Sequence, residues 1–222
     1  MGDIDWDLVS RSLWPLVRGA LTGTIPVALV SFVLGLALAL LVALMRLSHL
    51  RVLSGLARGY VSVIRGTPLL VQLFVIFYGL PSVGVTISPW PSAIIAFSLN
   101  VGGYAAEVIR AAILSVPKGQ WEAGHMIGMS NRQSLRRIIL PQAARVSVPP
   151  LSNTFISLVK DTSLASLILV TELFRQAQEI AAFSQEFMVL YVEAALIYWV
   201  VCLFLSSGQS MLETRLDRYV AH

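Results

Sequence analysis

The sequence predicts an all-α integral membrane protein with about five transmembrane helices, organised as one transmembrane domain over residues 1–222. Two observations support this fold class. The chain is 56% hydrophobic and only 13% charged, and its apolar residues come in long uncharged blocks. A helix of roughly 20 apolar residues crosses a hydrocarbon layer about 30 Å thick. Several of these blocks are long enough to do so.

The expected spans follow from the uncharged blocks and from the Gly and Pro residues between them. No charged side chain occurs from Gly19 to Met45, so the first span covers 19–45. The next uncharged stretch is divided at Gly79-Leu-Pro81 and at 88–91, which gives two spans joined by a short turn. The second to fifth spans are placed at 58–79, 90–112, 143–170 and 187–211.

The basic residues predict the orientation of the chain, because short cytoplasmic loops are enriched in Lys and Arg. The link between spans one and two, together with the start of span two, carries Arg46, Arg51, Arg58 and Arg65. The link between spans three and four carries Arg110, Lys118, Arg132, Arg136, Arg137 and Arg145. Both links are therefore expected in the cytoplasm. With five spans, this places the N-terminus outside and the C-terminus in the cytoplasm. Residues 1–18 are expected to form an amphipathic helix on the outer surface.

Several functional classes are not supported by the residues. Cys202 is the one cysteine, and the three histidines show no metal-ligand spacing, so no metal site is expected. No GxxxxGK[ST] motif is present, so the chain has no nucleotide site of the P-loop kind. Membrane topology accounts for the net charge of +4, and no nucleic acid is expected as a partner.

A charged, helix-forming segment over residues 115–141 interrupts the apolar pattern. A first short helix is expected up to Ile127, and Gly128 interrupts it. Ser130 and Gln133 form a capping-box pattern that begins a second helix. This pair of helices either fits into a cleft of a partner protein or lies against anionic membrane lipid.

The residues of this segment resemble a known motif. Glu122-Ala123-Gly124, then Gly128, then Ile138 with Leu140-Pro141, are similar to the EAA loop of ABC importer permeases. Gly124 departs from that pattern, which usually has Ala there.

The resemblance extends over essentially the whole chain. RGTPLLVQLF at 65–74, LNVGGYAAEVIRAAI at 99–113 and PLSNTFISLVKDTSLAS at 150–166 are similar to the polar amino acid permeases, a group with the type I ABC importer permease fold. FYGLPSVGV and ELFRQAQEI make the chain most similar to bacterial L-cystine permeases. Permeases for glutamine, arginine or histidine share most of these motifs.

The resemblance implies a transport complex of several subunits in the bacterial inner membrane. Two permeases, either two copies or a pair of similar chains, form the pathway, and an extracytoplasmic binding protein delivers the amino acid. ABC ATPase subunits bind ATP and Mg, so this chain has no catalytic site of its own. Glu122 is implied as the anchor in the ATPase cleft, and Gly128 as the turn.

Polar residues inside the spans are candidates for the substrate pathway, because they are costly in the bilayer without partners. Asn100, Tyr104 and Glu107 share one helix face of span three. Asn153, Ser157, Lys160 and Asp161 recur on span four. These groups either contact the substrate or pair with one another, as Lys160 with Asp161 or Glu107 with Arg110.

Prolines are expected to distort two spans. Gly66-Thr67-Pro68 is expected to bend the second span and to leave a carbonyl unpaired, and Pro149-Pro150 to break the fourth. An ATP-independent secondary transporter is the alternative from another class, but it would usually show two repeated halves, and no repeat is evident.

Overall fold

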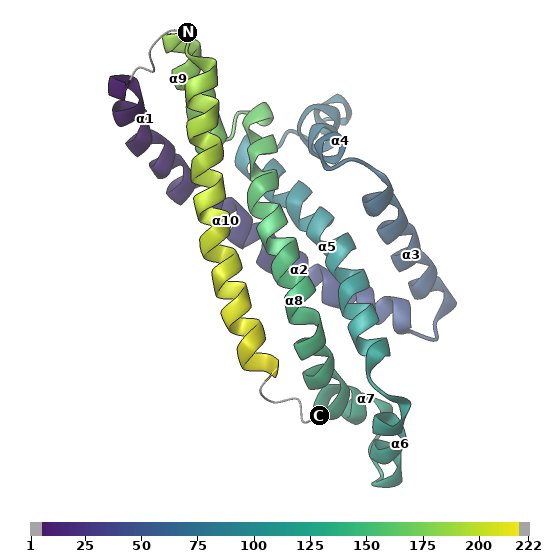
Figure 1. Cartoon of the computed structure of the whole chain (residues 1–222). Helices are drawn as coiled ribbons and strands as arrows, with labels where there is room; N and C mark the ends of the chain where they lie inside the picture. Colours follow the sequence, from purple (N-terminus) through teal and green to yellow (C-terminus); the bar gives the residue numbers. More distant parts are fainter. Residues whose placement is uncertain (1–5, 218–222) are drawn as a thin grey trace.

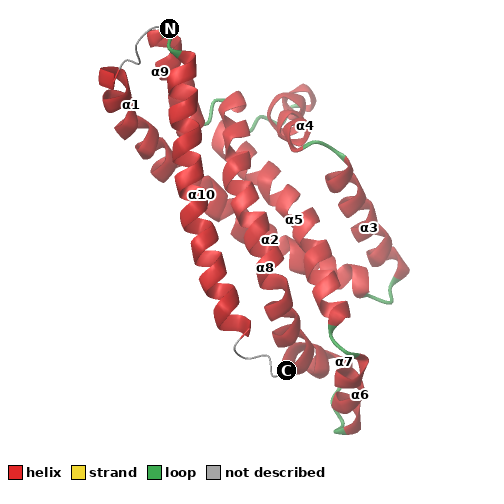
Figure 2. Ribbon diagram, viewed as in Figure 1, coloured by secondary structure: helices red, strands yellow, loops and turns green. Residues whose placement is uncertain are grey.

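The computed structural model describes residues 6–217, which are almost entirely helical (Figure 1). Figure 2 shows helices joined by short loops. Residues 1–5 of the expected outer segment and residues 218–222 at the C-terminal end lie outside the described residues. The prediction of an all-α chain is therefore confirmed for the part that the structure describes.

The first span belongs to a longer helix than the sequence indicated. Helix α1 (Trp6–Gly19) continues through a π-helical turn at Ala20–Thr24 into α2 (Ile25–Leu47). The continuous helix Trp6–Leu47 has 42 residues and is about 63 Å long at 1.5 Å per residue. Its first part packs through Leu16 against Leu173 and Ala177. The placement of this part at the outer surface stays a prediction.

The second predicted span, 58–79, is wrong as a single helix. Helix α3 (Arg51–Gly66) and the segment Leu69–Val83 meet at an angle of 106°. That segment comprises α4 (Leu69–Phe74), a π-helical turn and a 3-10 turn. Thr67 has extended backbone angles, as a residue before proline prefers, and Pro68 has no N–H to continue the helix. The expected bend at Gly66-Thr67-Pro68 is thus confirmed.

The fourth predicted span differs in the opposite way, because its helix is continuous where a break was expected. Pro149 and Pro150 lie inside α8 (Leu140–Asp161) and do not break it, so that expectation was wrong. The φ of proline is compatible with a helix, and α8 is held along α5 by the main apolar core. The chain bends instead by 47° between the 3-10 segment Thr162–Ile168 and α9 (Leu173–Ser184).

The structure contains the predicted five spans if each bent pair of helices is counted as one span. Three described helices are long and apolar enough to cross a membrane: Trp6–Leu47, Pro89–Ser115 (α5) and residues 187–215 of α10 (Phe187–Asp217). The two bent pairs raise the number to five if each pair is one span.

The main core lies between α2, α5 and α8, and small residues let these helices approach closely. Gly35 of α2 faces Val101 of α5, where an added Cβ would lie 2.6 Å from the valine side chain. Gly102 and Gly103 make similar approaches to α2 and α3. Close packing of small residues replaces the hydrophobic effect as the main attraction between helices in lipid.

The two ends of the bundle carry different elements. Helices α6 (Lys118–Met126) and α7 (Asn131–Ser134) lie at the same end of the bundle as the last turns of α10 (Figure 1). Helix α9 and the first turn of α1 lie at the other end (Figure 1). This arrangement agrees with an odd number of crossings. Which end faces the cytoplasm stays a prediction.

Candidate functional site

The first candidate site is the segment between α5 and α8, where α6 ends in a glycine-dependent turn. The N–H of Gly128 donates to the carbonyl of His125 at 2.9 Å, and the N–H of Met129 donates to that of Gly124 at 3.0 Å. This pair of hydrogen bonds is the Schellman motif, with Gly128 as the residue after the cap. Its φ of 79° lies in the left-handed region, so the expected elbow at Gly128 is confirmed.

The second short helix begins with the predicted capping box. The Ser130 side chain accepts from the N–H of Gln133 at 3.3 Å, and the Gln133 side chain accepts from the N–H of Ser130 at 2.8 Å. Helix α7 continues through a π-helical stretch, Leu135–Ile139, into α8. Both helix ends at the elbow are therefore satisfied locally, without a partner protein.

Gly124 permits close packing of the two short helices. It is buried, and a Cβ at this position would lie 2.6 Å from the Oγ of Ser134. Ser134 is fully buried as well. The departure from Ala at position 124 is thus matched to Ser134, rather than loosening the first short helix.

One side of this segment is packed against the bundle and the other is exposed. Ile139 and Ala143 pack with Ile113 and Val116, which joins the start of α8 to the end of α5. On the outside, Glu122 is exposed, and so are Met126 at 87% and Ile127 at 74%. We call the unit of residues 118–139 the knob. It presents one carboxylate and two large apolar side chains away from the bundle.

The second candidate site is a cleft of about 430 Å³ between α5, α8 and the break between α3 and α4. Five of the predicted pathway residues line it: Asn100, Tyr104, Asn153, Ser157 and Asp161. Thr67 and Pro68 line the third side. The volume is typical of small-molecule sites, which range from about 300 to 1,000 Å³.

Two predicted pathway residues are not in this cleft. Lys160 is exposed and does not line it, and it forms no ion pair with Asp161 in the described part of the chain. Consecutive residues of a helix do not face each other. The proposed pairing of Lys160 with Asp161 is therefore wrong.

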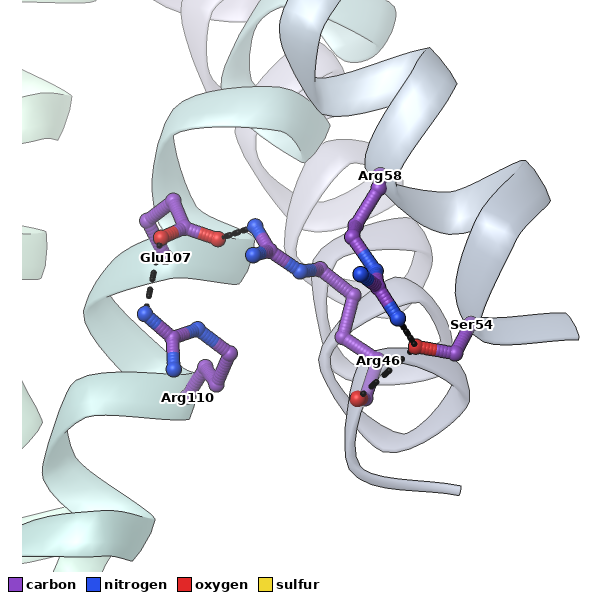
Figure 3. A network of polar contacts seen from close by, with 5 residues as sticks. All are labelled: Arg46, Ser54, Arg58, Glu107 and Arg110. Atoms are coloured by element: carbon purple, nitrogen blue, oxygen red, sulfur yellow. Dashed lines mark hydrogen bonds and ion pairs between the residues drawn. The ribbon is translucent and has the colours of Figure 1, made fainter. Parts of the chain in front are cut away.

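Glu107 lies among arginines instead of in the cleft (Figure 3). Its carboxylate forms an ion pair with Arg46 of α2 and a second one with Arg110 at 3.2 Å. Arg58 of α3 donates to Ser54 at 3.1 Å, and Ser54 donates to the carbonyl of Arg46 at 3.3 Å. The predicted pairing of Glu107 with Arg110 is confirmed. The carboxylate ties α5 to α2 and so has a packing role.

Sequence reasoning missed Gln72 of α4, which links the helix break to the cleft. Its side-chain amide donates to the carbonyls of Ile64 at 2.8 Å and Thr67 at 3.1 Å, and to the Thr67 hydroxyl at 2.9 Å. Its oxygen accepts from Asn100 at 3.2 Å. The sequence did contain a signal for this role: Gln72 comes four residues after Pro68, within reach of the Ile64 carbonyl that the proline leaves unpaired.

Arg65 was also missed as a neighbour of the cleft. Its guanidinium lies over the ring of Tyr104, 5.5 Å from the centroid. Cations are attracted to the faces of aromatic rings. A positive charge therefore stands beside one wall of the cleft, and the carboxylate of Asp161 belongs to another.

The chain matches the family described as "Binding-protein-dependent transport system inner membrane component" over residues 31–218. It is 62% identical over 219 residues to the L-cystine transport system permease protein TcyB of Bacillus subtilis (strain 168), with 98% of this chain and 94% of that protein covered. It is also 38% identical to the probable glutamine ABC transporter permease protein GlnM of the same organism, over 85% of each chain.

Solved structures agree with these sequence matches. The crystal structure of an amino acid ABC transporter with histidines aligns at a TM-score of 0.90 and 33% identity, covering 96% of this chain and all of that one. An inward-facing MetNI methionine ABC transporter shares the fold at a TM-score of 0.70 and 20% identity, covering 97% of this chain and 99% of that one. This chain therefore belongs to the family of inner membrane components of binding-protein-dependent transport systems.

Proposed function

We propose that this chain is the membrane-spanning subunit of an ATP-driven importer for L-cystine. It lies in the bacterial inner membrane, with the N-terminus outside and the knob and C-terminus in the cytoplasm. The observation that carries the proposal is the knob itself, a locally capped helix pair that exposes Glu122, Met126 and Ile127 at one end of the bundle.

The knob connects the chain to an energy source. An ABC ATPase subunit, which binds ATP and Mg, receives the knob in a cleft: Glu122 pairs with a basic group, and Met126 and Ile127 fill an apolar pocket. Closure of two such ATPase subunits moves the knobs and switches the pathway between its inward-facing and outward-facing forms. The remaining motif positions Ala123, Gly124, Gly128, Ile138, Leu140 and Pro141 shape the knob.

The cleft is where the amino acid passes. Asp161 attracts an ammonium group of the substrate, while the side-chain amides of Asn100 and Asn153 donate to its carboxylate. Asn153 and Ser157 are exposed in the single chain, and polar groups facing hydrocarbon are costly. This favours a second permease copy or a similar chain that covers the cleft. An extracytoplasmic binding protein delivers the substrate from the outer side of the membrane.

L-cystine is the proposed substrate because the 62% identical relative is named as an L-cystine permease. The alternative within the same machinery is glutamine, arginine or histidine, and the 38% identical relative named for glutamine belongs to the same family. Uptake by the reconstituted complex with its binding protein distinguishes them. We expect labelled cystine to accumulate and a tenfold excess of the other three amino acids not to compete.

The energy source is tested in the same vesicles. Removing ATP while the ion gradient is held should stop uptake, and collapsing the gradient while ATP is held should not. Uptake that follows the gradient alone would assign the chain to the ATP-independent secondary transporters instead.

The role of the knob is tested by charge reversal. Glu122→Arg should reduce co-purification of the ATPase subunit and uptake by at least tenfold, without loss of folded permease. Glu186→Arg is the matched control, since Glu186 is also exposed but precedes α10 at the opposite end. Normal ATPase binding by Glu122→Arg would contradict the proposal.

A further inference from the structure

A groove of about 550 Å³ lies where α2 and α5 end beside the knob. Its floor is apolar and includes Leu47, Ile113 and Leu135. Its rim carries three basic side chains, His49, Lys118 and Arg132. The groove is separate from the amino acid cleft, with which it shares no lining residue.

The basic rim has no acidic counterpart in the described chain. No carboxylate lines the groove. Lys118 and Arg132 are exposed, and their side chains make no ion pair or hydrogen bond with another described residue. Glu107 and Glu122, which are near in sequence or in space, do not line the groove, and Glu107 is already paired with Arg46 and Arg110. The rim therefore offers unneutralised positive charge.

The floor has the character of a membrane-facing surface. Leu114 lines the groove and is 59% exposed, although it lies in the apolar helix α5. Trp121 also lines it and is half-buried. Tryptophan is enriched where hydrocarbon meets the headgroups, and clusters of Lys and Arg attract anionic headgroups just beyond.

We propose that this groove binds an anionic phospholipid, with an acyl chain on the floor and the phosphate between Lys118 and Arg132. The combination of the two surfaces favours this occupant. A free phosphate ion would gain nothing from the apolar floor, and an acyl chain alone would leave the basic rim unpaired. The bound lipid connects the end of α2 to the knob, and this site does not depend on the proposed substrate.

Retention of lipid by the purified full-length protein tests the basic rim. Phosphatidylglycerol and phosphatidylcholine with identical acyl chains are offered together, and the retained lipids are counted by native mass spectrometry. We expect the wild-type protein to favour phosphatidylglycerol. Lys118→Gln/Arg132→Gln should lower that preference by about thirtyfold, given about 1 kcal/mol for each of the two basic residues near an anionic surface.

The control removes the same charge from the same segment. Arg136 and Arg137 are exposed on the knob but do not line the groove, so Arg136→Gln/Arg137→Gln should change the preference by less than twofold. An equal loss in both double variants would mean general surface attraction and would overturn the site.

Two further arms separate lipid from other occupants. Leu114→Asn keeps every charge of the rim, and it should still weaken retention of phosphatidylglycerol severalfold. Inorganic phosphate in excess should not displace the lipid, whereas displacement would indicate an ion site without an acyl chain. If assembly with the ATPase subunit expels the lipid, the groove belongs to a protein interface and the proposal fails.

Discussion

The side-chain nitrogen of Gln72 lies 2.8 Å from the carbonyl oxygen of Ile64, the acceptor that Pro68 leaves without a helical partner. A helix normally supplies that donor four residues later, and proline has none. The same side chain then accepts from Asn100 in the cleft wall. One glutamine thus stabilises a 106° bend and orients a pathway residue.

Replacing Gln72 should therefore affect stability and transport together. Gln72→Leu leaves the carbonyls of Ile64 and Thr67 without this donor and should cost about 1–3 kcal/mol. We expect a lower thermal midpoint in detergent and a weaker apparent affinity for substrate. Gln142→Leu is the control, because its amide donates to the Ile138 carbonyl within a continuous helical stretch and to the side chain of Gln120 at 3.4 Å, and it does not line the cleft. Equal effects of both variants would argue against a special role for Gln72.

The contact between Gly124 and Ser134 predicts a rescue. Gly124→Ala puts a Cβ 2.6 Å from the Ser134 hydroxyl, and such overpacking costs about 1–3 kcal/mol. We expect weaker binding of the ATPase subunit in a pull-down assay. Adding Ser134→Ala removes the clashing atom and should restore most of the binding. A double variant no better than Gly124→Ala would show that the two positions are not coupled.

The left-handed backbone of Gly128 predicts which residues it tolerates. Nothing lies within 4 Å of a Cβ at this position, so the restriction is conformational. Gly128→Val should lose about 1–2 kcal/mol in the elbow and reduce uptake strongly. Gly128→Asn should keep near-normal uptake, since Asn adopts this conformation more readily. If Val and Asn behave alike in the uptake assay, the elbow conformation is not what matters.

The arginines around Glu107 predict a structural role. Glu107→Gln leaves Arg46 and Arg110 with weaker partners and should cost about 1–3 kcal/mol, seen as a lower thermal midpoint. Apparent affinity for substrate in the remaining folded protein should stay within twofold. Glu179→Gln, in the more exposed pair with Arg175, should have little effect. A changed affinity with normal stability would return Glu107 to the substrate pathway.

Two neighbouring charges test the cleft. Asp161 lines it and Lys160 does not. Asp161→Asn removes a charge-assisted hydrogen bond to the substrate ammonium, so apparent affinity should fall about tenfold or more. Lys160→Gln removes an adjacent charge and should change affinity by less than twofold. The contrary pattern in an uptake titration would place the substrate elsewhere.

The sequence predicted best the features that depend on neighbouring residues. The capping box at Ser130 and Gln133, the elbow at Gly128 and the bend at Pro68 are all local, and the structure contains each of them. Helical spacing also placed Asn100 with Tyr104, and Asn153 with Ser157 and Asp161, on shared faces. That these two faces meet in one cleft could not be read from spacing.

The errors involved contacts between distant segments. Glu107 is paired across helices with Arg46, and periodicity within one span contains no information on that partner. The helix expected within residues 1–18 is present from Trp6, but it continues into the first span instead of forming a separate element, and Leu16 and Ser12 find contacts on α9 and α10. Pro149 and Pro150 do not break α8, which packs along α5. In each case tertiary packing outweighed the local preference.

The shared anchoring of α5 and α8 in the knob has a mechanical consequence. Ile113 and Val116 at one helix end and Ile139 and Ala143 at the other pack in a single cluster, so a push on the knob acts on both cleft walls at once. Asn100 lies about 20 Å along α5 from this fulcrum. A tilt of roughly 5° at the knob then displaces the wall by about 2 Å, the scale on which packed helices change between discrete states.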